Sequence, residues 1–240
     1  MAIFTVDESQ RRAAKVAGFL YLLTTLAANF TEFYVRQRLN AHGDAIETAR
    51  NIAGSGRLFR IGIAGDLITI AGSVALVAAL FVILKPVSRN LALIAAFWAL
   101  VECSIGGVII ANNYAALLTL QGIGCPLACD MTQLPAAARL LVSVDTAGNR
   151  VAALFFGLAS TLFCYLWFRS RYVPRLLAAW GILASLVPII IPLSTMMLPA
   201  WQDFYLRRAR TGTPIAIFGI VVGFWLLMKG IRSPASRARD

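Results

Sequence analysis

The chain has 240 residues, of which 59% are hydrophobic and only 14% are charged, and its formal net charge is +11. Soluble globular domains carry about 25% charged residues, so the polar side chains here are too few to coat one. This composition excludes a soluble globule. It predicts one all-α membrane domain over residues 1–240, folded as a polytopic helix bundle.

Six segments approach the length of a membrane-spanning helix, which needs about 20 mainly apolar residues. None of them shows the period-two alternation of a membrane β-strand. The predicted transmembrane helices cover residues 15–34, 61–84, 91–120, 137–168, 176–198 and 214–228. The third and fourth are longer than a bilayer is thick and are expected to tilt or project, whereas the sixth has the shortest apolar run.

The first segment also fits a second interpretation. Basic residues precede its apolar run, and Thr25 and Ala27 have the small side chains of a processing site, as in a cleavable signal peptide. The apolar character continues through Phe33 to Val35, which favours a membrane anchor.

The loop after the first segment contains a predicted amphipathic helix over residues 44–53. Asp44 and Glu47 have the spacing of a capping box, and Ala45, Ala49 and Ile52 recur at helical intervals. We expect this helix to lie on the outer membrane surface, as a connector that covers the helix ends or as a binding element.

The distribution of Lys and Arg predicts the orientation of the chain. Short loops rich in these residues stay in the cytoplasm, and the hairpins around Lys85, Arg89, Arg169, Arg171 and Arg175 contain no acidic residue. Both termini are therefore expected inside, in the cytoplasmic (inner) membrane of a bacterium, with anionic lipid headgroups as partners of the positive charge. Nucleic-acid binding is disfavoured because the basic residues are divided between two aqueous faces.

Four cysteines and one histidine limit the metal and redox chemistry. Cys125 and Cys129 lie in the loop between the third and fourth segments, where an oxidising exterior favours a disulfide, and two reduced thiols are the alternative. His42 stands alone in a polar loop, and the sequence lacks hydrolase, phosphate-loop and dinucleotide motifs. We therefore expect no metal, no cofactor and no catalytic residue.

Ionisable residues interrupt the apolar segments at four places, and each is costly at membrane depth. Counted from the cytoplasmic boundaries, Asp66, Asp145 and Arg150 fall near the outer edge of the hydrocarbon, while Glu102 lies near the midplane, about 13 residues from Arg89. Arg150 and Asp145 are separated by about 140° around a helix and cannot easily pair. Asp66 is therefore the expected partner of Arg150, with Glu102 as the second choice.

These charges, together with nearby amides, predict an outward-facing polar cavity inside the bundle. The candidate ligand-binding residues are Asp66, Glu102, Asn112, Asn113, Asp145, Asn149 and Arg150, with Asn29 as a further lining residue. The alternative interpretation is structural: Asp66 and Arg150 form an ion pair near the headgroups, and Glu102 is protonated or hydrogen-bonded between helices.

Two further patterns concern packing. Gly65, Thr69 and Ser73 form a stripe of small residues suited to close helix contact. Pro188 and Pro192 are expected to kink the fifth helix.

Three segments together resemble a known family. They are SGRLFRIGIAGDL from Ser55, LKPVSRNLALIAAF from Leu84 and FFGLASTLFCYLWFRSRYVPRLL from Phe155. In this order they resemble the uncharacterised bacterial membrane family catalogued as domain of unknown function 4386, with similarity from about Arg12 to Lys229. The resemblance implies a multi-helix membrane fold and brings no activity, substrate or cofactor with it.

The pattern of buried charge favours binding or transport of a small polar or amphipathic solute through the cavity, with Glu102 changing its protonation during the cycle. Two other functions stay open. One is a non-catalytic sensor or assembly subunit, in which paired charges lock helices together. The other is an intramembrane enzyme acting on lipids with Asp66, Glu102 or Asp145 as general acid or base, which the lack of a nucleophile or metal-ligand motif disfavours.

Overall fold

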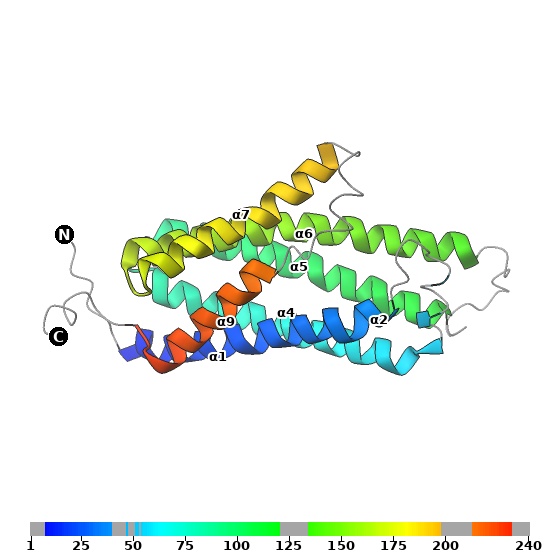
Figure 1. Cartoon of the computed structure of the whole chain (residues 1–240), viewed down its shortest axis with the longest axis horizontal. Coiled ribbons are helices and arrows are strands. Elements are labelled where there is room, and N and C mark those ends of the chain that lie inside the picture. The colour runs from blue at the N-terminus through cyan, green and yellow to red at the C-terminus, as the bar shows by residue number, and fades with distance from the viewer. Residues whose placement is uncertain are drawn as a thin grey trace, which may run out of the picture.

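The computed structural model describes residues 8–39, 47, 51–52, 54–120, 134–197 and 213–231, and within these ranges it contains helices and no strand (Figure 1). The all-α prediction is therefore confirmed for this part of the chain. The helices are α1 (Glu8–Phe30), a π-helical stretch η1 (Thr31–Arg36), α2 (Gln37–Leu39), α4 (Gly56–Leu84), α5 (Arg89–Leu120), α6 (Leu134–Ser170), α7 (Arg175–Met197) and α9 (Thr213–Met228). Of the predicted surface helix over residues 44–53, only Glu47, Asn51 and Ile52 are described, and all three are helical.

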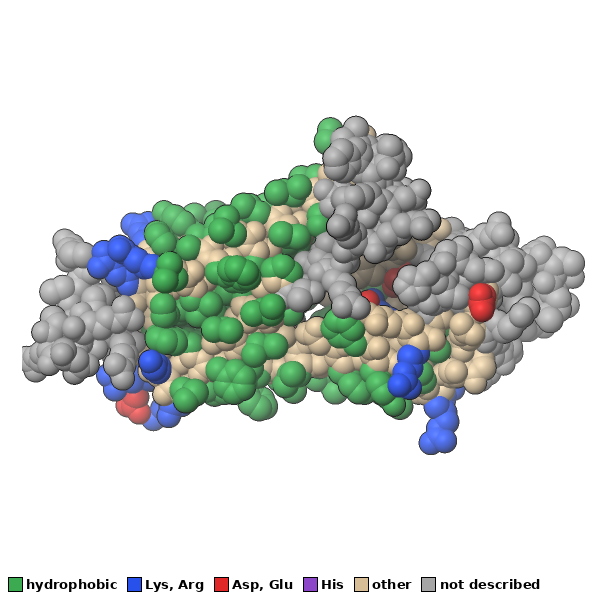
Figure 2. Space-filling model, in the orientation of Figure 1, with side chains coloured by type: hydrophobic (Ala, Val, Ile, Leu, Met, Phe, Trp, Pro, Cys, Tyr) green, Lys and Arg blue, Asp and Glu red, His purple; other side chains and the backbone are tan. Residues whose placement is uncertain are grey.

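Five helical segments are long and apolar enough to cross a membrane, and the first of them runs without a break from Glu8 to Leu39. The sixth predicted span is also present as a helix, but α9 has only 16 residues. At 1.5 Å per residue this is about 24 Å, less than the roughly 30 Å of a hydrocarbon layer. Figure 2 shows hydrophobic side chains covering much of the flank of the bundle, which is the surface expected of helices that face lipid.

The five long helices and α9 form a closed ring. Each packs on two neighbours, in the order α1, α4, α5, α6, α7, α9 and back to α1. The short α4–α5 and α6–α7 hairpins lie at one end, where α1 also begins and α9 ends (Figure 1). We call this the hairpin end and the opposite one the open end.

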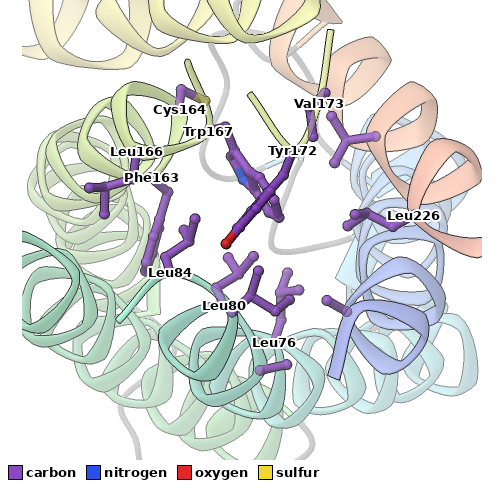
Figure 3. Packing of buried hydrophobic residues seen from close by; sticks show 14 of the residues in the cluster. Leu76, Leu80, Leu84, Phe163, Cys164, Leu166, Trp167, Tyr172, Val173 and Leu226 are labelled. Atoms are coloured by element: carbon purple, nitrogen blue, oxygen red, sulfur yellow. The ribbon is translucent and has the colours of Figure 1, made fainter. Parts of the chain in front are cut away.

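The ring is filled by apolar side chains in its hairpin half. Figure 3 shows Leu80 and Leu84 of α4, Trp167 of α6, Tyr172 of the α6–α7 hairpin and Leu226 of α9 meeting at the centre. All five are at most 2% exposed. Trp167 and Tyr172 meet edge to face, with ring centroids 6.4 Å apart. This cluster, the hairpin-end core, closes the middle of the ring at that end.

Tyr172 reaches the centre because the α6–α7 turn is very tight. Arg171 adopts a left-handed conformation with φ of 58°, while its backbone N–H donates to the Trp167 carbonyl at 3.1 Å. The hydroxyl of Ser170 donates to the same carbonyl. The turn therefore folds the tyrosine back beneath α6 instead of leaving it in the loop.

Small residues let α1 lie close against α4 and α9. A Cβ added to Gly65 would collide with Thr31 Oγ1, and one on Gly72 would lie 2.7 Å from Thr24 Cγ2. On the other side of α1, a Cβ on Gly18 would lie 2.9 Å from the carbonyl oxygen of Gly223. The predicted stripe on α4 thus does mark a close helix contact, with Gly65 as its member at the interface.

The prolines of α7, Pro188 and Pro192, lie in its second half. Each removes a backbone donor and crowds the preceding turn, which bends a helix. In Figure 1 the part of α7 beyond them leans away from α6. The hydroxyl of Ser185, just before the prolines, accepts a hydrogen bond from Thr161 of α6 at 3.1 Å, so the two helices stay joined up to that point.

Candidate functional site

Asp66 lies on α4 in the open half of the ring, and its partner is Arg36. The Arg36 guanidinium Nη2 is 2.9 Å from Asp66 Oδ2, and the side chains are 34% and 20% exposed. The prediction that Arg150 is the partner of Asp66 is therefore wrong. The physical reason is helix order: α1 and η1, which carries Arg36, pack along α4, whereas α4 and α6, which carries Arg150, touch over little of their length.

Asp145 of α6 accepts hydrogen bonds from two side-chain amides. Asn113 of α5 donates to its Oδ1 at 3.0 Å. Asn149, one turn further along α6, donates to its Oδ2 at 3.2 Å and to its backbone carbonyl at 2.8 Å. Asp145 and Asn149 therefore lie on one face of α6.

The ion pair and the amide network belong to one polar cluster. Arg36 of η1 forms its ion pair with Asp66 of α4, and it also interacts electrostatically with Asp145 of α6 at longer range. We define the polar cluster as Arg36, Asp66, Asn113, Asp145 and Asn149. It contains four of the seven predicted ligand-binding residues together with Arg36, which was not among the predicted residues.

Glu102 lies deeper, on the same face of α5 as Asn113 and about 16 Å closer to the hairpin end. Its Oε2 accepts a weak hydrogen bond from the Cys103 thiol at 3.4 Å. It forms no ion pair with any described residue. One turn beyond it, Ala99 belongs to the hairpin-end core, so Glu102 stands at the boundary between the core and the polar half.

The other predicted lining residues are placed differently. The Asn29 amide donates a hydrogen bond to the Thr25 carbonyl of its own helix, α1, at 2.7 Å. Asn112 of α5 and Arg150 of α6 are half-buried. Cys125 and Cys129, the candidate disulfide, and His42 lie outside the described residues, while Cys103 and Cys164 are buried free thiols.

Among the described residues, no three His, Cys, Asp or Glu side chains come together as a metal site. The polar cluster instead offers two carboxylates, one guanidinium and two amides, a set of hydrogen-bonding groups suited to a polar solute. Figure 2 shows acidic side chains, with a basic one beside them, at the bottom of a hollow in the open half of this face. A separate groove of about 450 Å³ runs between α1 and α4, and none of the predicted ligand-binding residues lines it.

The fold and the cluster define a class of protein: an all-α bundle whose described residues include five helices long and apolar enough to cross a membrane, with a polar cluster in one half and an apolar core in the other. The family model described as domain of unknown function (DUF4386) matches residues 16–230. The chain therefore belongs to this family, as its sequence segments indicated. No curated protein and no solved structure matches the chain.

Proposed function

We propose that this chain is an integral membrane protein that binds or transports a small polar or amphipathic solute through the open half of its ring. The observation that carries the proposal is the division of the ring. The Arg36–Asp66 ion pair and the amide network of Asp145 both lie in the open half, whereas the hairpin half is closed by apolar side chains. Buried charge at membrane depth is costly and is retained where it acts on a substrate or ion.

The orientation that we propose places both termini and the hairpin end in the cytoplasm of a bacterium, with α9 and its flanking residues as a sixth span. The basic residues of the two hairpins support this orientation through the positive-inside rule. The polar cluster then faces the outside, and the hairpin-end core faces the cytoplasm.

Transport requires that the site open to one side at a time. The hairpin-end core is the inner closure, and Glu102 stands just outside it. Protonation of Glu102 would remove a charge at the point where a solute passes from the cluster toward the core. We therefore assign this carboxyl to the coupling of solute movement to proton binding. In a protein that only binds the solute, the core stays closed throughout.

Access to the open half can be tested without knowledge of the solute. In a background with the four native cysteines replaced by serine, we expect Asn113→Cys to react with a membrane-impermeant, cationic thiosulfonate added from outside. Val77→Cys, at a position that is 8% exposed in the hairpin-end core, is the matched control and should not react. Equal rates at both positions would remove the distinction between an accessible and a closed half.

Function requires a second measurement, with purified protein in proteoliposomes and a panel of labelled polar and amphipathic solutes. Asp145→Asn and Glu102→Gln keep side-chain shape while removing charge, and we expect each to abolish uptake or saturable binding of any solute that the wild type takes. Glu8→Gln is the control, since Glu8 lies in an exposed ion pair at the hairpin end. Uptake unchanged in both site variants would refute the proposal.

One observation favours a second candidate, a sensor or assembly subunit. The Arg36–Asp66 pair joins η1 to α4 with a separation of 2.9 Å, as expected of a contact that only locks helices. In that case Glu102→Gln would behave like the wild type in every solute assay, and a stoichiometric protein partner would co-purify with the chain.

A further inference from the structure

The α1–α4 groove lies on the outside of the ring. Its walls are Leu26 and Phe30 of α1 and Ile61 and Ile68 of α4, and its floor includes Ala64 and Gly65. The four wall residues are 48% to 61% exposed. All of these residues belong to segments long and apolar enough to cross a membrane, so in the membrane orientation proposed above the groove faces hydrocarbon.

The open-end mouth of the groove is basic. Along the helical segment from α1 through η1 to α2, three side chains stack in succession from the wall. Phe30 stacks on Tyr34 with ring centroids 5.1 Å apart, and the Arg38 guanidinium lies over the Tyr34 ring at 4.3 Å. On α4, Arg57 stands one helical turn before Ile61 and on the same face. Both arginines are exposed, and neither forms an ion pair with a described residue.

The two arginines lie at the same level along the bundle. Thr31 and Gly65 are in contact across the helix interface. From that contact Arg38 is seven residues and Arg57 eight residues further toward the open end. Because α4 begins at Gly56, the partial positive charge of its N-terminus lies there too.

This arrangement separates Arg38 from the polar cluster. Arg36 and Arg38 are two residues apart, which places them on nearly opposite sides of a helix. Arg36 turns to Asp66, and Arg38 stays on the lipid-facing side against Tyr34. The basic mouth is therefore a second site, independent of any solute in the ring.

We propose that the α1–α4 groove is a binding site for one anionic phospholipid, with an acyl chain between Phe30 and Ile68 and its phosphate held by Arg38 and Arg57. The groove extends about 10 Å along the helices, a large part of the roughly 15 Å depth of one leaflet. Tyr34 lies between the apolar walls and the arginines, at the interfacial level where tyrosine is favoured. A zwitterionic lipid fits the groove equally well but gains less from the mouth, since each basic residue near the surface attracts only net negative charge.

The experiment uses the full chain in phosphatidylcholine vesicles that contain a trace of lipid with a photoactivatable acyl chain. The probe is either phosphatidylglycerol or phosphatidylcholine with the same labelled chain, and peptide mass spectrometry measures crosslinking to residues 23–30 and 61–68. At low salt we expect about tenfold more crosslinking with the phosphatidylglycerol probe, because two arginines favour the anionic headgroup. Soluble glycerol phosphate should not reduce it, which distinguishes a lipid from a free phosphate as the ligand.

Two variants separate the headgroup from the chain. Arg38→Gln with Arg57→Gln should lower phosphatidylglycerol crosslinking to the phosphatidylcholine level. Ala64→Phe should fill the floor and lower crosslinking of both probes, whereas Ala75→Phe, at another exposed alanine on the same face of α4 three turns away, should leave both unchanged. Equal crosslinking of the two probes in the wild type, an unaltered ratio in the double glutamine variant, or equal losses at Ala64 and Ala75 would overturn the proposal.

Discussion

The Arg36–Asp66 ion pair allows a quantitative test of helix order in the ring. Exposed ion pairs couple by less than about 1 kcal/mol, whereas loss of one partner from a fully buried pair costs about 3–5 kcal/mol. With side chains 34% and 20% exposed and a separation of 2.9 Å, this pair lies between these limits. We expect a coupling energy of about 2 kcal/mol from a double-mutant cycle of Arg36→Gln and Asp66→Asn.

The assay is reversible unfolding of the purified protein in mixed micelles with increasing dodecyl sulfate, followed by helical circular dichroism. Each single variant should destabilise by more than half of the coupling energy, and the double variant should recover part of the loss because no unpaired charge remains. The control cycle is Glu8→Gln with Arg12→Gln, an i,i+4 pair at 2.6 Å that is 76% and 79% exposed and should couple by about 0.3–0.5 kcal/mol. A coupling energy for Arg36 and Asp66 no larger than that of the control would refute the partner assignment.

Three further predictions concern packing and the tight turn, measured in the same unfolding assay. Gly18→Ala should cost about 1–3 kcal/mol, because its Cβ would meet the Gly223 carbonyl at 2.9 Å, whereas Gly107→Ala, with nothing within 4 Å, should gain up to about 1 kcal/mol; equal effects would contradict the close α1–α9 contact. Arg171→Gly should stabilise by about 1 kcal/mol, since φ of 58° is strained for residues with a Cβ, and a loss of stability would contradict this. Tyr172→Phe should be neutral or stabilising, because the Tyr172 hydroxyl has no hydrogen-bond partner among the described residues. Burial raises the pKa of Tyr172 above its usual value of 10.0. Wild-type stability should therefore be full below pH 10 and fall as the pH rises from there toward the raised folded pKa. Tyr172→Phe should reduce that loss, and identical alkaline stability profiles of the two proteins would refute the burial of the Tyr172 hydroxyl.

Hydropathy was sufficient to predict the helices because their ends coincide with changes from charged to apolar residues. The predicted starts at residues 91, 176 and 214 lie within two residues of Arg89, Arg175 and Thr213. The main error is at the N-terminus, where α1 begins at Glu8, seven residues before the predicted start at residue 15. That turn is held by the Glu8–Arg12 pair and by Gln10, whose amide donates to the Ile83 carbonyl at 3.4 Å. A prediction based on the number of apolar residues cannot detect such polar contacts.

The site was predictable in composition but not in pairing. Polar residues inside apolar segments identified Asp66, Asn113, Asp145 and Asn149, because each is costly there unless it has a partner. Arg36 was missed because the predicted first helix stopped at residue 34, whereas the helical structure continues through the π-helical stretch to Leu39. Which arginine meets Asp66 depends on the order of helices around the ring, and a single sequence carries no signal for that order.

Stability and function are expected to reside in different halves of the ring. The hairpin half buries Trp167, Tyr172, Leu84 and Leu226 almost completely, and a large-to-small change of such side chains costs about 2–5 kcal/mol. The polar cluster contributes one partly exposed ion pair and three amide hydrogen bonds, and a typical intramolecular hydrogen bond contributes only about 0.5–1.5 kcal/mol net. If the cluster binds a solute as proposed, removal of the Asp145 charge should affect solute binding far more than unfolding.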